Sequence, residues 1–397
     1  MKTRKFLAHL SWGMALCLAG SSGEAMRLQQ LAHEVTVVNI AVPLRVFDGE
    51  KFVDSLTIGD FEVYEDGVKQ EVEAVYLVRK TQVDRGAPPD PIRPPSAMPR
   101  QLESDVKARH FVLFFLMDEY LPELSRAIDM FFSDALAPGD TLRVETLEDS
   151  WQLRSDASDK VPPQAQAEQL KSRLRKSLAL GGFRLRSLLA TLQALANDLK
   201  ENPEGFNPLA ARDAVEQIVH LKFLDEKRVK NLAGLLKGLE GQKHVILFYQ
   251  KESYLVPTPF VQYFDDLAAE QRGEVKPEKI KELFADAATA VHFLYITKTK
   301  MTGGDVEFRE SQSVMPVEMT GDFFQAFRNM AVATGGVMES SANAEFALRK
   351  TATAVDNYYL LYYRPAAYKA DGKFKTIEVK VKGRRYNVSH RAGYIDK

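Results

Sequence analysis

An unbroken apolar run, His110 to Met117, most constrains how this chain can fold. A run of this length, with charge only after its end, is typical of a strand that is buried on both faces of a sheet. The apolar spacing from Pro122 to Phe132 predicts a helix, residues 137–140 form a turn signal, and the alternation from Leu142 to Thr146 predicts a second strand. A strand, a helix and a strand with short connections indicate a parallel sheet.

Strands and amphipathic helices continue to alternate as far as residue 356. Further strands are expected at Trp151–Arg154, His244–Tyr249, Val291–Ile296 and Val337–Met338. Helices are expected around residues 170–178, 188–199, 215–221, 232–239, 260–267, 280–287, 323–330 and 344–355. Over residues 106–356 this order predicts an α/β fold with a doubly wound, mostly parallel sheet that has helices on both faces.

Period-two alternation flanks the α/β region on both sides. Residues 34–80 alternate between apolar and polar and are interrupted by Asp-Gly turns, and residues 357–397 return to the same pattern. Because a lone hairpin is marginal in water, the two segments are expected to pair or pack as one antiparallel β subdomain. Between the first module and the α/β domain, residues 81–105 are rich in proline and poor in apolar residues, which predicts a semi-rigid linker.

The first 25 residues predict export. Basic residues precede an apolar segment from Phe6 to Gly20, and small residues follow as far as Ala25, which is the layout of a secretory signal peptide. The single cysteine, Cys17, lies inside this segment, so disulfides and thiol chemistry are excluded from a mature chain. The formal net charge of -1 does not point to nucleic acid, and no other segment is apolar enough to span a membrane. We therefore expect a periplasmic or extracellular protein.

Several blocks of the sequence, taken in order, resemble a known family. They are Asp60–Gly67, Arg109–Leu113, Gly241–Lys243, Thr334–Gly336, Tyr359–Pro365, Asp371–Phe374 and Arg391–Tyr394. Together they resemble the exported bacterial, acidobacterial-type proteins that contain a domain related to von Willebrand factor type A (VWFA). The resemblance extends over nearly the whole mature chain and implies a VWFA-like, Rossmann-type fold with flanking β segments and a role in binding.

The resemblance also indicates where a metal-ion-dependent adhesion site would lie. Such domains hold Mg²⁺ with oxygen ligands from three loops, Asp-x-Ser-x-Ser, a Thr and an Asp, because Mg²⁺ is a hard cation. In this chain Asp118 is followed by Tyr120 and Pro122 at the serine positions, Phe183 stands at the threonine position, and Lys251 replaces the last carboxylate. Lys251 would repel a cation or pair with Asp118. We therefore predict a degenerate site without a metal, with Asp118 as a vestigial ligand, and no other cofactor.

Catalytic motifs are missing from the sequence. There is no Gly-x-Ser-x-Gly, no phosphate-binding glycine loop and no His-Glu-x-x-His. His110, His244 and His292 each begin a predicted buried strand, where a structural role is expected. The adjacent pair Asp118 and Glu119 does not suit acid–base work, which requires two differently tuned groups that face one substrate. The sequence thus favours a protein that is not an enzyme.

The functional hypothesis is an exported protein that mediates protein–protein interaction or adhesion through the loops at the strand ends, without a metal. We call this surface the strand-end rim, and its predicted contact residues are Asp118, Glu119, Tyr120, Phe183, Arg184, Gln250 and Lys251. The partner is expected to be a protein, whose identity the sequence does not give. Two alternatives stay open: a structural component of a cell-envelope assembly that uses β-strand addition, and a cation-dependent adhesin that uses Glu119 and other unusual ligands.

Overall fold

The computed structural model describes residues 39–49, 51–80, 82–85, 108–117, 119–154, 161–222, 226–272, 277–302, 313–318 and 321–396. The predicted signal peptide (residues 1–25) and Asp118 lie outside these residues. Most of the predicted linker (residues 81–105) does so too, but a short strand within that range, β5 (Gln82–Arg85), pairs with β4 (Val68–Arg79).

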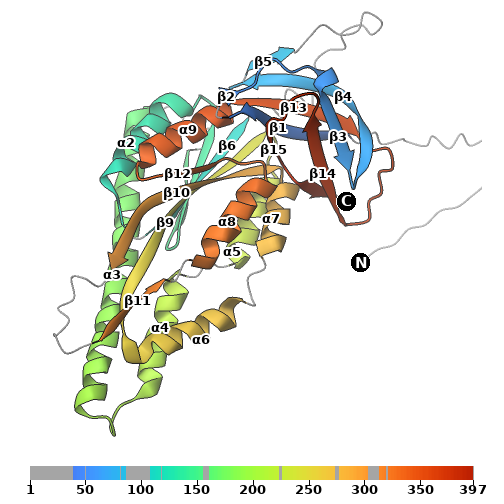
Figure 1. The fold of residues 1–397 in the computed structure, drawn as a ribbon. Helices are drawn as coiled ribbons and strands as arrows, with labels where there is room; N and C mark the ends of the chain where they lie inside the picture. The colour runs from blue at the N-terminus through green and yellow to red at the C-terminus, as the bar shows by residue number, and fades with distance from the viewer. Residues whose placement is uncertain are drawn as a thin grey trace, which may run out of the picture. The chain divides into compact units, whose positions relative to one another are not determined.

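A mixed sheet forms the centre of the α/β region (Figure 1). Its described strands are β6 (Arg109–Leu116), β7 (Thr141–Thr146), β8 (Ser150–Arg154), β9 (Gln242–Pro257), β10 (Thr289–Thr302), β11 (Val314–Glu318) and β12 (Met338–Ser341). They follow the order β12-β10-β9-β6-β7-β8, with β11 added beside β9. All neighbours are parallel except β8 and β11, which are antiparallel to β7 and β9. The apolar run that begins at His110 therefore forms a central strand, as its composition predicts.

Helices cover both faces of this sheet (Figure 1). They are α2 (Pro122–Met130) with the π-helical η2 (Phe131–Ala135), the N-terminal half of α3 (Pro163–Glu201), α5 (Glu226–Lys237), α7 (Pro277–Asp286), α8 (Gly321–Ala333) and α9 (Ala344–Asp356). Two further helices, α4 (Pro208–Lys222) and α6 (Val261–Arg272), belong to a separate core. Successive side chains of β6 point to opposite faces, so Phe115 packs with α2, α3 and α9, whereas Phe114 packs with α5, α7 and α8. The α/β region is therefore buried from both sides.

The flanking segments form one antiparallel sheet. Its described strands are β1 (Ile40–Asp48), β2 (Lys51–Phe52), β3 (Phe61–Glu65), β4, β5, β13 (Asn357–Arg364), β14 (Phe374–Val381), β15 (Asn387–His390) and β16 (Gly393–Ile395), and a 3-10 turn, η1 (Ile58–Asp60), precedes β3. Strand β13 pairs with β1 on one side and with β4 on the other. The expected association of the N- and C-terminal β segments is therefore confirmed.

Helix α3 corrects one detail of the sequence prediction. A loop was expected at Gly181 to Arg184 between two helices, but α3 runs through these residues without a break. Each glycine in a helix interior costs about 1 kcal/mol relative to alanine. The buried stripe of Leu174, Leu178, Leu185 and Leu189 continues in phase across the two glycines, and this burial outweighs their cost. The same stripe was visible in the sequence.

The central strands extend beyond their expected ends. Strand β9 was expected to end at Tyr249 but continues to Pro257, and beyond Gln250 it pairs with β10 on one side and with β11 on the other. Tyr254 and Val256 in this extension share a separate core with the C-terminal half of α3, with α4, with η4 (Thr258–Phe260) and with α6. We call this unit the helical lobe (Figure 1).

Gly241, which precedes β9, illustrates a position where the fold requires glycine. Its φ is +90°, and an added Cβ would lie 2.3 Å from the carbonyl oxygen of Ala108, the residue before β6. We expect Gly241→Ala to lower the free energy of unfolding by about 2 kcal/mol or more, measured by urea denaturation. Gly67→Ala is the matched control because Gly67 has a φ of +80° but has no atom within 4 Å of an added Cβ. Equal losses in the two variants would contradict the steric explanation.

Candidate functional site

The predicted strand-end rim does not assemble as a set of loops. Gln250 was expected after the end of a strand, but it lies inside β9 with 1% of its surface exposed. Asp118 and the side chain of Lys251 lie outside what the structure describes, so the predicted ion pair between them stays a prediction. Glu119 is exposed, and Tyr120 is partly buried beside α3.

The carboxylates at the carboxyl end of β7 are paired with arginines. The pairs are Glu145 with Arg228 (2.5 Å), Glu148 with Arg184 (2.6 Å) and Asp149 with Arg173 (2.8 Å). The first of these carboxylates, Glu145, is buried, and Arg228 of α5 also donates to the carbonyl oxygens of Leu147 and Asp149. Arginine side chains therefore already occupy the acidic groups nearest the carboxyl end of β7.

Helix α3 closes this end of the sheet. The hydroxyls of Thr146 and Ser177 are hydrogen-bonded at 2.8 Å, and the space between α3 and the ends of β6 and β7 is only about 10 Å³. That volume is at the lower limit for one water molecule. A metal site of the expected kind would lie between loops at this end of the sheet. In the described part of the chain, the packed helix α3 lies there instead.

The surface of α3 at this end is both apolar and cationic. Phe183 is 65% exposed and Leu180, one helical turn earlier, is 48% exposed. The guanidinium group of Arg175 lies 4.6 Å from the centre of the Tyr120 ring and donates a hydrogen bond to Ser125. Of the predicted contact residues, Tyr120, Phe183 and Arg184 thus share contact with α3 or belong to it, whereas Gln250 does not reach this surface.

No group of three or more His, Cys, Asp or Glu side chains that could hold a metal ion occurs among the residues that the structure describes. In the same part of the chain, no helix is long and apolar enough to cross a membrane.

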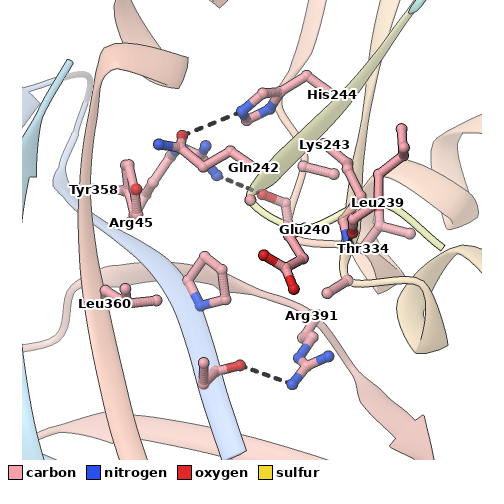
Figure 2. A pocket seen from close by; sticks show the side chains of 16 residues that line it. Arg45, Leu239, Glu240, Gln242, Lys243, His244, Thr334, Tyr358, Leu360 and Arg391 are labelled. Carbon is pink, nitrogen blue, oxygen red and sulfur yellow. Dashed lines mark hydrogen bonds between the residues drawn. The ribbon is translucent and has the colours of Figure 1, made fainter. Parts of the chain in front are cut away.

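A cavity of about 250 Å³ lies at the opposite end of the mixed sheet, where the amino ends of β9 and β10 face β1 and β13 (Figure 2). We call it the junction cavity. Its polar lining includes Arg45, Glu240, His244, Thr334 and Arg391, and the remaining lining is mostly apolar. Arg45 is only 3% exposed. No motif or spacing in the sequence predicts this cavity.

Two histidines that the sequence places 48 residues apart meet at the wall of the junction cavity. Nδ1 of His292 accepts a hydrogen bond from the backbone N–H of Val337 at 3.1 Å, and Nε2 of His292 lies 3.1 Å from Nδ1 of His244. Burial lowers the pKa of both rings well below the usual value, so both are neutral. Because Nδ1 of His292 must accept, its Nε2 carries the proton and donates to His244. His244 therefore carries its own proton on Nε2, which lies 3.4 Å from the side-chain oxygen of Gln242.

Several sequence blocks that carry the family resemblance converge at this junction. Thr334 forms an isolated β-bridge with Arg391, and the N–H of Ala392 donates to the carbonyl of Ala333 at 2.6 Å. A Cβ on Gly335 would lie 2.7 Å from the backbone of His390. The contacts of these blocks therefore connect the antiparallel sheet to the amino end of the mixed sheet. Their spacing alone could not show that they meet, because they are distant in sequence.

No protein-family model and no curated protein matches this chain. Among solved structures, the N-terminal domain of TFIIH p34 is similar at 8% sequence identity, over 63% of this chain and 98% of that domain, with a TM-score of 0.23. A similarity this low carries no argument about fold family or function.

Proposed function

We propose that this chain is an exported, non-enzymatic protein with a doubly wound, VWFA-like domain, and that it acts by protein–protein contact or adhesion without a bound metal. The observation that carries the proposal is the exposed apolar pair Leu180 and Phe183 on α3, at the carboxyl end of β6 and β7. Ligand sites in sheets of this kind lie beyond the carboxyl ends of the strands. The export part of the proposal rests on residues 1–25 of the sequence.

The chemistry of this surface favours a protein partner over a small substrate. Aromatic residues and arginine are enriched in the centres of protein interfaces. Here Phe183 is flanked by Arg184, whose charge is balanced by Glu148 at 2.6 Å. An exposed aromatic residue beside an arginine fits this composition, whereas the nearby space of about 10 Å³ cannot admit a substrate.

The proposal predicts that two substitutions on α3 abolish partner capture. The purified chain is immobilised, and envelope and extracellular proteins of the source cell are passed over it. We expect specific proteins to be retained, and we expect Leu180→Asp/Phe183→Asp to lower their recovery at least tenfold, because two charges would then be buried in the contact. Val332→Asp is the matched control, since Val332 on α8 is 70% exposed. Retention that is absent, or equal in all three proteins, would contradict the proposal.

The two alternatives make different predictions. Strand addition requires a long free edge, yet the terminal strands β15, β16, β12 and β8 of the described sheets have 4, 3, 4 and 5 residues. A cation-dependent adhesin would bind Mg²⁺, Mn²⁺ or Ca²⁺ saturably in a calorimetric titration. We expect no such binding, either by the native chain or by Asp118→Ala. Saturable binding that the Asp118 variant loses would replace the metal-free proposal with the cation-dependent one.

A further inference from the structure

The junction cavity contains an arginine whose charge is not matched by an acid. Nη1 of Arg45 donates to the carbonyl oxygen of Gly335 at 2.9 Å (Figure 2). Nε of Arg45 donates to the carbonyl oxygen of Ala354 at 2.6 Å. Among the described residues, no carboxylate forms an ion pair with Arg45, and its Nη2 has no hydrogen-bond acceptor. Burial lowers the pKa of Arg45 to about 10, so the group is still charged at neutral pH.

A buried cation of this kind is costly unless an anion compensates it. Buried charges in proteins are normally paired. An unpaired buried charge loses its hydration and gains no attraction to an opposite charge. Arg45 differs in this respect from the buried Arg109, which contacts two carboxylates. The cavity beside Arg45 is where a compensating anion would fit.

Other donors in the cavity point to the same chemistry. The hydrogen-bond chain from Val337 through His292 fixes His244 with its proton on Nε2, and the 3.4 Å contact of that atom with Gln242 is long enough to be exchanged for a better acceptor. Arg391, which is also buried, lines another part of the cavity. A guanidinium group and a neighbouring N–H donor match the two oxygens of a carboxylate.

The remaining lining selects among anions. Ala41, Leu239, Ala290 and Leu360 give the cavity an apolar wall, which suits a hydrocarbon body more than a bare inorganic ion. Glu240 is exposed at the cavity and carries a negative charge, which disfavours dianions such as phosphate. A volume of about 250 Å³ corresponds to roughly eight water molecules, so the ligand would have on the order of ten non-hydrogen atoms.

We propose that the junction cavity is a binding site for a small organic monocarboxylate, with its carboxylate held by Arg45 and His244 and its apolar body against Ala290 and Leu360. The site lies at the amino end of β9 and β10, whereas the proposed protein-contact surface on α3 lies at the carboxyl end of the sheet. The two proposals therefore stand or fall separately.

Calorimetric titration of the purified chain with benzoate tests this site, with benzamide as a neutral probe of the same shape and inorganic phosphate as the competing anion. We expect benzoate to bind one to one with a dissociation constant below about 1 mM, and the other two probes to bind at least tenfold more weakly. No benzoate binding would overturn the proposal. Benzamide binding as tight as benzoate, or tighter binding of phosphate, would overturn the assignment of a monocarboxylate.

Two variants separate the charge of the site from its volume. Arg45→Met removes the charge, and Ala290→Leu keeps every donor but fills the cavity; each is expected to weaken benzoate binding roughly tenfold to a hundredfold. Arg349→Met is the control, because Arg349 is an exposed arginine on α9 that does not line the cavity. If Arg45→Met does not fold, Ala290→Leu still decides the outcome. If Ala290→Leu binds benzoate with unchanged affinity, benzoate binds outside the junction cavity and the proposed site is wrong.

Discussion

Replacing Arg109 with methionine is expected to lower the free energy of unfolding by about 3–5 kcal/mol, the largest loss that we predict for one substitution in this chain. Arg109 begins β6 and is 1% exposed. Its guanidinium group contacts both carboxylate oxygens of Asp140, donates to Asp356 at 2.9 Å and donates to the carbonyl of Ala135 at 2.9 Å. Methionine fills a similar volume but would leave Asp140 without its cation and Asp356 with only Lys80, whose Nζ lies 4.0 Å from it.

The loss should be this large because Asp140 cannot regain water and Asp356, whose side chain is 16% exposed, can do so only in part. Asp140 is 2% exposed, and burial raises the pKa of Asp356 above its ordinary value even though Arg109 opposes that shift. Conversely, the hydrogen bonds and charges of Asp140 and Asp356 raise the pKa of Arg109 despite the opposing effect of burial. Removing one partner of such a buried ion-pair cluster lowers the free energy of unfolding by far more than the intact cluster contributes to it.

The matched control is Arg349→Met. Arg349 also contacts two carboxylates, Asp134 at 3.1 Å and Glu345 at 3.2 Å, but it is 53% exposed. Exposed ion pairs contribute about 0–1 kcal/mol, so this variant should unfold at nearly the native urea concentration. Comparable losses in the two variants would show that burial is not what makes the Arg109 cluster important.

The predictable part of the fold is the part in which local pattern and burial agree. The apolar run that became β6 is buried on both faces, so its composition was sufficient to identify a central strand. The glycine pair in α3 predicts a turn when it is taken alone, but the buried apolar stripe that continues through it determines the structure. At β9 the charged Lys251 and Glu252 suggested an end, but the strand continues into the helical lobe, where Tyr254 and Val256 are buried.

The junction cavity could not be predicted because it depends on contacts between distant segments. Alternation in β1 places Ala41, Pro43 and Arg45 on the face opposite Val42 and Leu44. One face of an antiparallel sheet often meets water, and nothing local shows that this face instead packs against the ends of β9 and β10. The only signal was composition: the covered face holds two small residues and one arginine, where a solvated strand face would normally carry several charges.

Acidification is expected to destabilise the chain through its buried histidines. Burial lowers the pKa values of His244, His292 and His390 below the usual histidine value of about 6.5. Below pH 6.5 the unfolded chain therefore binds protons that the folded chain does not, so stability falls as pH falls and is fully present above that pH. A group whose pKa is lowered far enough contributes a limiting slope of about 1.4 kcal/mol per pH unit, so His244 and His292, whose pKa values fall well below the usual one, together approach about 2.8 kcal/mol per unit. His390, whose pKa is lowered less, adds a smaller slope of the same sign.

The geometry of the pair gives this dependence a structural cause. The Nδ1 atom of His292 faces the N–H of Val337, and the Nδ1 atom of His244 faces the protonated Nε2 of His292. A proton added to either Nδ1 atom would therefore face another N–H group, and the hydrogen bond there would be lost. The charges around the pair oppose protonation as well: Arg45, Arg109 and His110 lower the pKa of His244, and Arg45 lowers that of His292, in each case after burial. The pair should therefore resist protonation until the fold opens.

Urea denaturation at a series of pH values measures the slope directly, and one double variant assigns it. His244→Gln/His292→Gln removes the two groups whose pKa values are lowered most, so we expect the limiting slope below pH 6.5 to fall by about 2.8 kcal/mol per unit and to leave only the smaller contribution of His390. His220→Gln is the control: His220 is 60% exposed on α4, and its removal should leave the slope unchanged. A native chain that keeps the same stability from neutral pH to below 6.5 would refute the neutral, hydrogen-bonded pair, and with it the fixed Nε2–H of His244 on which the monocarboxylate site depends.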